Sequence, residues 1–187
     1  MAITFQEDNK MPELKSIEVN LNIPLFGGIK GTWEPNDKER EAAWELYVEL
    51  VTRISVVELK RGEGIVREAL NSLYSLFGMT REILRKYGPD VAKPSKENEY
   101  SFGKLSFIIL NYQLRPLLSK WHPLLQEYEA KKDKDISIKE HEDKWERISE
   151  LREELDKTRK ILIDYSKHLA KVASVVPLYK ENEENNS

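Results

Sequence analysis

Polar side chains recur along one side of the otherwise apolar segment of residues 101–128. On a helical wheel at about 100° per residue, this strip consists of Lys104, Asn111, Arg115 and His122, within about 40° of one another, with Ser119 and Gln126 beside them. An imidazole transfers protons near neutral pH, and a guanidinium stabilises negative charge that develops on a phosphate. The strip could line a cleft, in which these side chains would form a candidate site. As the solvent-facing side of a buried helix, it would have no chemical role.

Arg115 and His122 are separated by six residues. This spacing resembles the Arg-x(4–6)-His motif of the HEPN ribonucleases, which are also small helical bundles. The resemblance implies that the paired Arg and His of two protomers converge on a scissile phosphate, where His122 would assist proton transfer and Arg115 would neutralise charge. Asn111 on the same strip completes the candidate catalytic set. Pro116 departs from the pattern, because that family commonly has a polar residue there.

The sequence Glu-His-Glu-Asp at residues 140–143 combines an imidazole with carboxylates and forms a candidate metal site. Adjacent residues on a helix point about 100° apart, so these four cannot hold one ion without ligands from elsewhere. Acidic residues in a first helical turn also complement the helix dipole, which explains the run without a metal. We therefore expect no metal and no cofactor. His168 follows Asp164 by four residues, the spacing of an ordinary surface pair on a helix.

The four tryptophans are distributed over the chain at Trp33, Trp44, Trp121 and Trp145. Most are expected to pack in the core or at its ends. Aromatic residues are enriched at protein interfaces, and Trp121 stands in a polar context between Lys120 and His122. Trp121 is therefore the candidate for an exposed anchor that contacts a partner.

The composition describes one helical domain with a heavily charged surface, since 40% of the 187 residues are hydrophobic and 34% are charged. With 30 basic and 33 acidic residues, the net charge of -3 disfavours a general nucleic-acid binder unless the cations cluster locally.

The absence of cysteine excludes disulfides and a thiol nucleophile. The first ten residues contain no apolar signal sequence, and the most apolar run, 105–118, is short of the roughly 20 residues that span a bilayer. We expect a cytoplasmic protein.

Apolar and polar residues alternate from Ile17 to Ile23, which is the period of a half-buried strand. Glycines at 27 and 28 then predict a turn into a second strand over 29–33, so the segment predicts a β-hairpin. An isolated hairpin is only marginally stable, so Val19, Leu21 and Ile23 should lie against the helices or against a second subunit. The free edge of the first strand predicts a homodimer or another protein partner.

Helical periodicity predicts helices over 36–59 and 66–87, an intervening turn, and a loop over 90–99. A third helix begins near Ser101, and Pro116 and Pro123 are expected to bend or divide it near Trp121. A fourth helix is predicted by a heptad whose members are Ile148, Leu151, Leu155, Thr158, Leu162, Tyr165, Leu169, Val172 and Val176.

These elements predict a mainly α protein, an up-and-down four-helix bundle over residues 36–178. A lead and a β-hairpin arm over 1–35 precede it, and a disordered acidic tail over 179–187 follows. We expect a soluble, non-catalytic interaction or regulatory module that binds another copy of itself or a different protein, without membrane or DNA contact. Two alternatives stay open: a HEPN-like ribonuclease that acts on RNA through Arg115 and His122, and a bundle that senses a small ligand in an apolar cavity.

Overall fold

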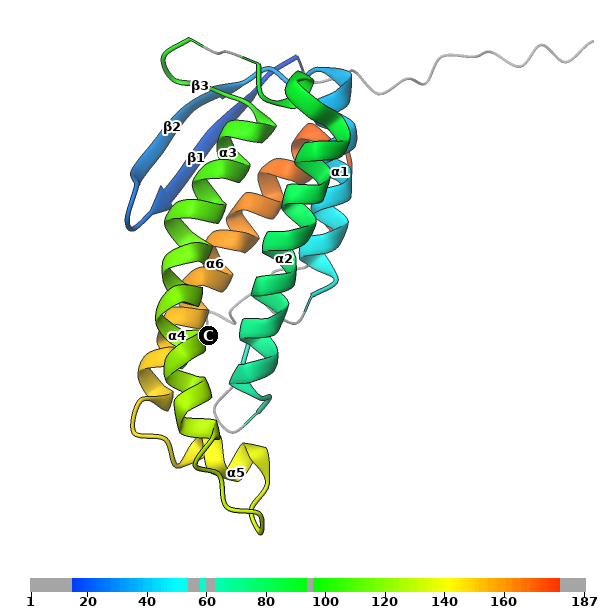
Figure 1. Cartoon of the computed structure of the whole chain (residues 1–187). Coiled ribbons are helices and arrows are strands. Elements are labelled where there is room, and N and C mark those ends of the chain that lie inside the picture. Colours follow the sequence, from blue (N-terminus) through cyan, green and yellow to red (C-terminus); the bar gives the residue numbers. More distant parts are fainter. Residues whose placement is uncertain (1–14, 54–57, 60–62, 94–95, 179–187) are drawn as a thin grey trace, which may run out of the picture.

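The structure is a computed structural model that describes residues 15–53, 58–59, 63–93 and 96–178 (Figure 1). Its long helices lie side by side, and a small sheet lies beside the upper half of the bundle in this view. The helical elements are α1 (Asp37–Val51), α2 (Val66–Tyr87), η2 (Gly88–Val91), α3 (Phe102–Ile108), η3 (Ile109–Leu114), α4 (Arg115–Glu129), α5 (Ile138–Asp143) and α6 (Ile148–Val172). The prediction of a mainly α bundle preceded by a hairpin is confirmed. No helix within the described residues is both long enough and apolar enough to span a membrane.

The sheet consists of β1 (Ile17–Ile23), β2 (Gly27–Trp33) and β3 (Glu99–Tyr100). β1 and β2 form the predicted antiparallel hairpin, in which the N–H of Phe26 donates to the carbonyl of Ile23 at 2.9 Å and Gly27 adopts a φ of 102°. β3 pairs in parallel with the end of β2. The sequence predicted only a loop over residues 90–99, so the short strand β3 was missed.

A glycine permits the approach of this third strand. The N–H of Thr32 donates to the carbonyl of Asn98 at 2.9 Å, just before β3. A Cβ atom at Gly31 would lie 2.0 Å from the same carbonyl oxygen, so only glycine fits there. A local sequence pattern does not reveal this requirement, because it arises from residues that are far apart in the chain.

α1 begins as predicted and ends earlier than predicted. Asn36 and Glu39 form a reciprocal capping box, with the side chain of each accepting the backbone N–H of the other at 3.0 Å. The helix ends at Val51, whereas the sequence predicted an end near Leu59. Thr52 stops it with a hydroxyl that donates to the carbonyl of Val48 at 2.7 Å, because such a side chain competes with the backbone for hydrogen bonds.

The helix from Phe102 to Glu129 is continuous but changes its winding at η3, which is a π-helical turn. The predicted break near Trp121 was therefore wrong in position. The π turn ends at Leu114, two residues before Pro116, whose nitrogen cannot donate to the carbonyl four residues back, so the helix changes its hydrogen-bond register there. Pro123 lies inside α4 without ending it.

α6 buries the predicted heptad from Leu151 to Val172, whereas Val176 lies beyond the helix and is exposed. The helix also buries a second flank that includes His168 and Ala170, because it packs against α1 on one side and against β1 on the other. The residues around His141, which were expected at the start of this helix, form the separate helix α5 instead.

Glu39 connects three elements at the upper end of the bundle. Its side chain accepts hydrogen bonds from the indole N–H of Trp33 at 3.1 Å and from the backbone N–H of Phe102 at 2.8 Å. Burial raises the pKa of this carboxyl above its usual value. The end of β2, the start of α1 and the start of α3 are thereby held together by one side chain.

Candidate interaction surface

Three aromatic side chains from distant parts of the sequence meet at the surface. Phe26 lies between β1 and β2, whereas Phe107 and Tyr112 lie in α3 and η3. The ring of Tyr112 lies 5.0 Å from that of Phe26 and 6.5 Å from that of Phe107, measured between centroids, with edge-on geometry in both pairs. Phe26, Phe107 and Tyr112 nevertheless keep 43%, 57% and 36% of their surfaces exposed. We call these three residues the aromatic cluster.

The π turn explains why two of the rings meet. In η3 the N–H of Arg115 donates to the carbonyl of Leu110, five residues back. This wider turn brings residues five apart, such as Phe107 and Tyr112, toward the same side of the helix. In a regular α-helix they would point roughly 140° apart.

Asn111 and Arg115 complete the surface of this turn. The side-chain amide of Asn111 donates to the carbonyl of Phe107 at 2.9 Å, and its oxygen accepts from Nε of Arg115 at 3.1 Å. The guanidinium carbon of Arg115 lies 5.5 Å from the ring centroid of Phe77 in α2. Arg115 is thus held, exposed, above the seam between α2 and α4.

His122 contacts a different set of α2 residues. Its Nδ1 lies 2.9 Å from Nη1 of Arg67, and its ring lies edge-on to Tyr74 at 5.8 Å. Arg67 also donates hydrogen bonds from Nε and Nη2 to the carboxylate of Glu129, at 2.6 to 3.1 Å. Since a guanidinium only donates, Nδ1 accepts and the proton lies on Nε2. Burial, followed by the charge of Arg67, lowers the pKa of His122, so the ring is neutral.

The structure therefore joins Asn111 and Arg115 by a hydrogen bond, with Arg115 over Phe77 of α2, whereas His122 contacts Arg67 and Tyr74 of α2. Within the described part of one chain, Arg115 and His122 do not form a hydrogen-bonded pair. The Nε2–H of His122 is buried and has no partner among the described residues. A neutral imidazole in this tautomer is arranged as a donor at Nε2, not as a base.

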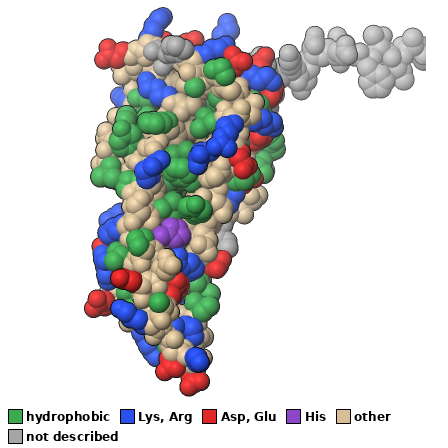
Figure 2. All heavy atoms as spheres, in the orientation of Figure 1, with side chains coloured by type: hydrophobic (Ala, Val, Ile, Leu, Met, Phe, Trp, Pro, Cys, Tyr) green, Lys and Arg blue, Asp and Glu red, His purple; other side chains and the backbone are tan. Residues whose placement is uncertain are grey.

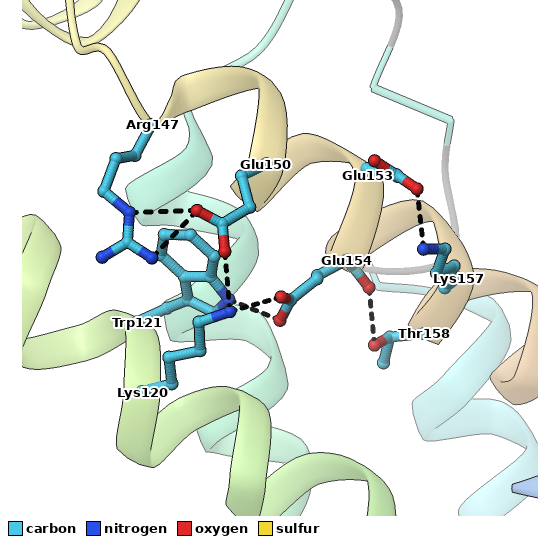
Figure 3. A network of polar contacts seen from close by, with 8 residues as sticks. All are labelled: Lys120, Trp121, Arg147, Glu150, Glu153, Glu154, Lys157 and Thr158. Carbon is cyan, nitrogen blue, oxygen red and sulfur yellow. Dashed lines mark hydrogen bonds and ion pairs between the residues drawn. The ribbon is translucent and has the colours of Figure 1, made fainter. Parts of the chain in front are cut away.

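Trp121 is fully buried, so the prediction of an exposed anchor was wrong. Its ring lies among the side chains of Lys120, Arg147 and Glu154 (Figure 3). Its indole N–H donates to Glu154 of α6 at 2.7 Å, and Lys120 and Arg147 lie over the ring at 4.4 and 4.7 Å from a centroid. Hydrogen bonds from Lys120 to Glu154 and Glu150 raise the pKa of the lysine. The charged side chains near Trp121, which suggested an exposed position, instead form ion pairs that cover the indole ring.

The three strand residues proposed as interaction candidates are also covered by the chain itself. Val19, Leu21 and Ile23 are buried in the same core as the helices. The N–H of Asn20, at the outer edge of β1, donates to Nε2 of His168 at 3.2 Å. His168 is buried, and its Nδ1 contacts the backbone carbonyl of Asp164 at 2.7 Å, so the predicted surface pair with a carboxylate was wrong.

The acidic run at residues 140–143 serves helix termini and packing. Glu142 is buried and accepts from the N–H groups of Val66 and Arg67 at 2.9 and 3.2 Å, which satisfies the start of α2. His141 stacks on Tyr128 with 4.1 Å between ring centroids. No group of three His or carboxylate side chains among the described residues is placed to hold a metal ion.

Charge is unevenly distributed over the seam between α2 and the helix α3–η3–α4. Residues 102–126 contain no Asp or Glu, and neither do residues 69–81 of α2. The exposed cations there include Arg81 and Arg115. Hydrophobic side chains gather over the middle of this face, with Lys and Arg side chains beside them (Figure 2). We call the exposed surface of these two segments, together with Phe26, the acid-free face.

A hollow of ≈ 500 Å³ opens at the upper end of this face, between α2 and α3. Its lining includes Leu84, Ala92, Gly103 and Phe107, together with Lys93 and Lys104. The hollow is open to solvent, unlike the enclosed cavity that a sensor of small ligands would require.

Comparison of this chain with models of known protein families, with curated proteins and with solved structures finds no match.

Proposed function

We propose that this chain is a non-catalytic interaction module that holds a protein partner on the acid-free face. The observation that carries the proposal is the aromatic cluster. Its three rings contact one another at the surface and keep more than a third of their area in solvent. Aromatic side chains in such positions are the usual anchors of protein interfaces.

The winding of the helix supports the same conclusion. A π turn has poorer hydrogen-bond geometry than an α-helix and is frequently found at functional sites. Here the turn displays Phe107 and Tyr112 without burying them. The rest of the turn packs in the core, so the benefit of these two exposed rings is expected to come from a contact outside the chain.

A selection from displayed peptides tests the proposal. A library of random peptides is selected on the folded protein, and enriched peptides are then measured against Phe107→Ser and Tyr112→Ser. Trp44→Ser is the matched control, since Trp44 is an equally exposed aromatic residue on α1. We expect a loss of affinity of roughly tenfold for the two cluster variants and none for the control. Failure to enrich any peptide, or enrichment that both cluster variants retain, would contradict the proposal.

A further inference from the structure

We infer that the partner segment is an acidic amphipathic helix that lies along the seam between α2 and α3–η3–α4. This inference rests on the proposed function and names the class of partner. Four features of the acid-free face carry it: its charge, its apolar rings, the hollow at its upper end, and one exposed glycine.

The charge of the face selects an acidic partner. The chain has 33 acidic residues, yet none lies in the 25 residues from Phe102 to Gln126 or between Glu68 and Glu82. Arg81 of α2 and Arg115 of α4 are both exposed, and Arg115 lies over the ring of Phe77 across the seam. Carboxylates of a partner would meet cations there without repulsion from carboxylates within residues 69–81 and 102–126. A second copy of the same face would oppose cation to cation, which disfavours a symmetric dimer through it.

The apolar part of the face provides seats for hydrophobic side chains. Tyr74 is 66% exposed and lies at the seam against His122, and Phe77 lies under Arg115. Farther up, Leu84 and Phe107 border the hollow, which has room for one anchoring side chain. These apolar positions follow the seam between two antiparallel helices, so they match the row of apolar side chains on one face of an amphipathic helix.

Gly78 marks the place where a partner backbone comes closest. It lies inside α2, one turn after Tyr74 and nearly one turn before Arg81. A glycine in a helix interior is less favourable than alanine. A Cβ atom at this position would meet nothing within 4 Å, so packing within the described chain does not require a glycine. Its place between an exposed ring and an exposed cation fits the close approach of a second helix.

Fluorescence anisotropy with defined probes tests the inference. The probe is a labelled peptide of about 16 residues, with Leu at helical spacing on one face and Glu elsewhere. The comparison probes are a scrambled peptide of equal composition, the same helix with Lys in place of Glu, and a single-stranded RNA. We expect the acidic helix to bind at least about tenfold more tightly than each of the three.

Three variants localise the binding. Arg115→Glu and Gly78→Leu should each weaken the acidic helix by roughly tenfold, whereas Lys160→Glu, on the exposed side of α6, should leave it unchanged. Denaturant unfolding of each variant checks that the fold is intact.

Preference for the Lys peptide or for RNA, or equal binding by all variants, would overturn the inference. If displayed peptides of another composition bind the face and the acidic helix does not, only the inference fails. If no peptide binds at all, the proposed function fails too.

Discussion

The side chain of Gln113 donates a hydrogen bond to the hydroxyl of Thr158 across the core, at 2.8 Å. Both residues are buried, and the hydroxyl of Thr158 in turn donates to the carbonyl of Glu154 at 2.9 Å. Gln113 belongs to the π turn and Thr158 to the heptad of α6. This bond fixes the rotation of the turn, and thereby which of its side chains point to solvent.

Thr158→Val should therefore destabilise the fold although it preserves shape. The substitution removes the acceptor and leaves a buried amide without a partner, at a cost of about 1–3 kcal/mol in the free energy of unfolding. The double variant Gln113→Leu/Thr158→Val should recover part of that loss, since neither polar group is then buried alone. Urea unfolding of the single and double variants measures the coupling. Strictly additive losses would show that the pair does not act as a unit.

Leu162→Ala should cost about 2–5 kcal/mol, because it leaves a cavity at a fully buried position in the middle of α6. Lys160→Ala on the same helix is the control, with an expected change within about 0.5 kcal/mol. Denaturant melts of both variants check the difference. A loss below about 1 kcal/mol for Leu162→Ala would mean that α6 is peripheral to the core.

Stability should fall in mild acid through His168. Burial lowers the pKa of this ring below its usual value of 6.5, and its Nε2 already accepts from Asn20. Above about pH 7 the ring is neutral in the folded and the unfolded chain, so its contribution is complete. As the pH falls through 6.5, the unfolded chain binds a proton that the folded chain does not, and the free energy of unfolding decreases.

His168→Gln removes this titration and keeps an acceptor for Asn20. The difference in stability between the native chain and the variant should shrink between about pH 7.5 and 5.5, as the native chain loses its advantage. Other titrating groups, such as His122, are present in both proteins and cancel from the comparison. If the free energies of unfolding of the two proteins changed in parallel with pH, titration of His168 would not contribute to the pH dependence of stability.

Gly78→Ala should stabilise the folded chain by about 0.5–1 kcal/mol, because alanine restricts the unfolded backbone and has room at this position. A thermal or urea melt measures the gain. Destabilisation would indicate that the glycine is needed for packing inside the chain, and would remove one support for a partner at that place.

Arg115→Ala and His122→Ala should both fold. Arg115 is exposed, so its loss should change the free energy of unfolding by no more than about 0.5 kcal/mol. His122 accepts one bond from Arg67, which keeps Glu129 as a partner, so that variant should lose about 1 kcal/mol. Urea melts compare the two. Collapse of either variant would make the residue a structural support of the α2–α4 seam.

Much of the secondary structure could be predicted because its signals are local. Asn36 and Glu39 mark a helix start through their spacing, the alternation from Ile17 to Ile23 marks a strand, and Gly88 ends α2 where the sequence predicted. β3 was missed, since its two residues have no period and pair only because Gly31 admits the preceding carbonyl.

The surface was harder to predict than the elements, because exposure depends on contacts between distant segments. Trp121 stands among charged residues in the sequence, yet α6 brings Glu154 to its N–H and buries it. Phe107 and Tyr112 are apolar in the sequence and were assigned to an enclosed helix, yet the π turn leaves them exposed. The lack of Asp and Glu from Phe102 to Gln126 is visible in the sequence and is a signal for this face, beside the polar strip that contains Asn111 and Arg115.

The position of α6 has a consequence for how the chain is made. α6 packs against both β1 and α1, and the bond from Asn20 to His168 spans 148 residues. During synthesis the hairpin and the first helix leave the ribosome long before α6 does, so the contact between β1 and α6 cannot form until α6 has also been made. Closure of such distant contacts is slow, and a nascent chain that stalls before α6 presents Val19, Leu21 and Ile23 to chaperones and proteases.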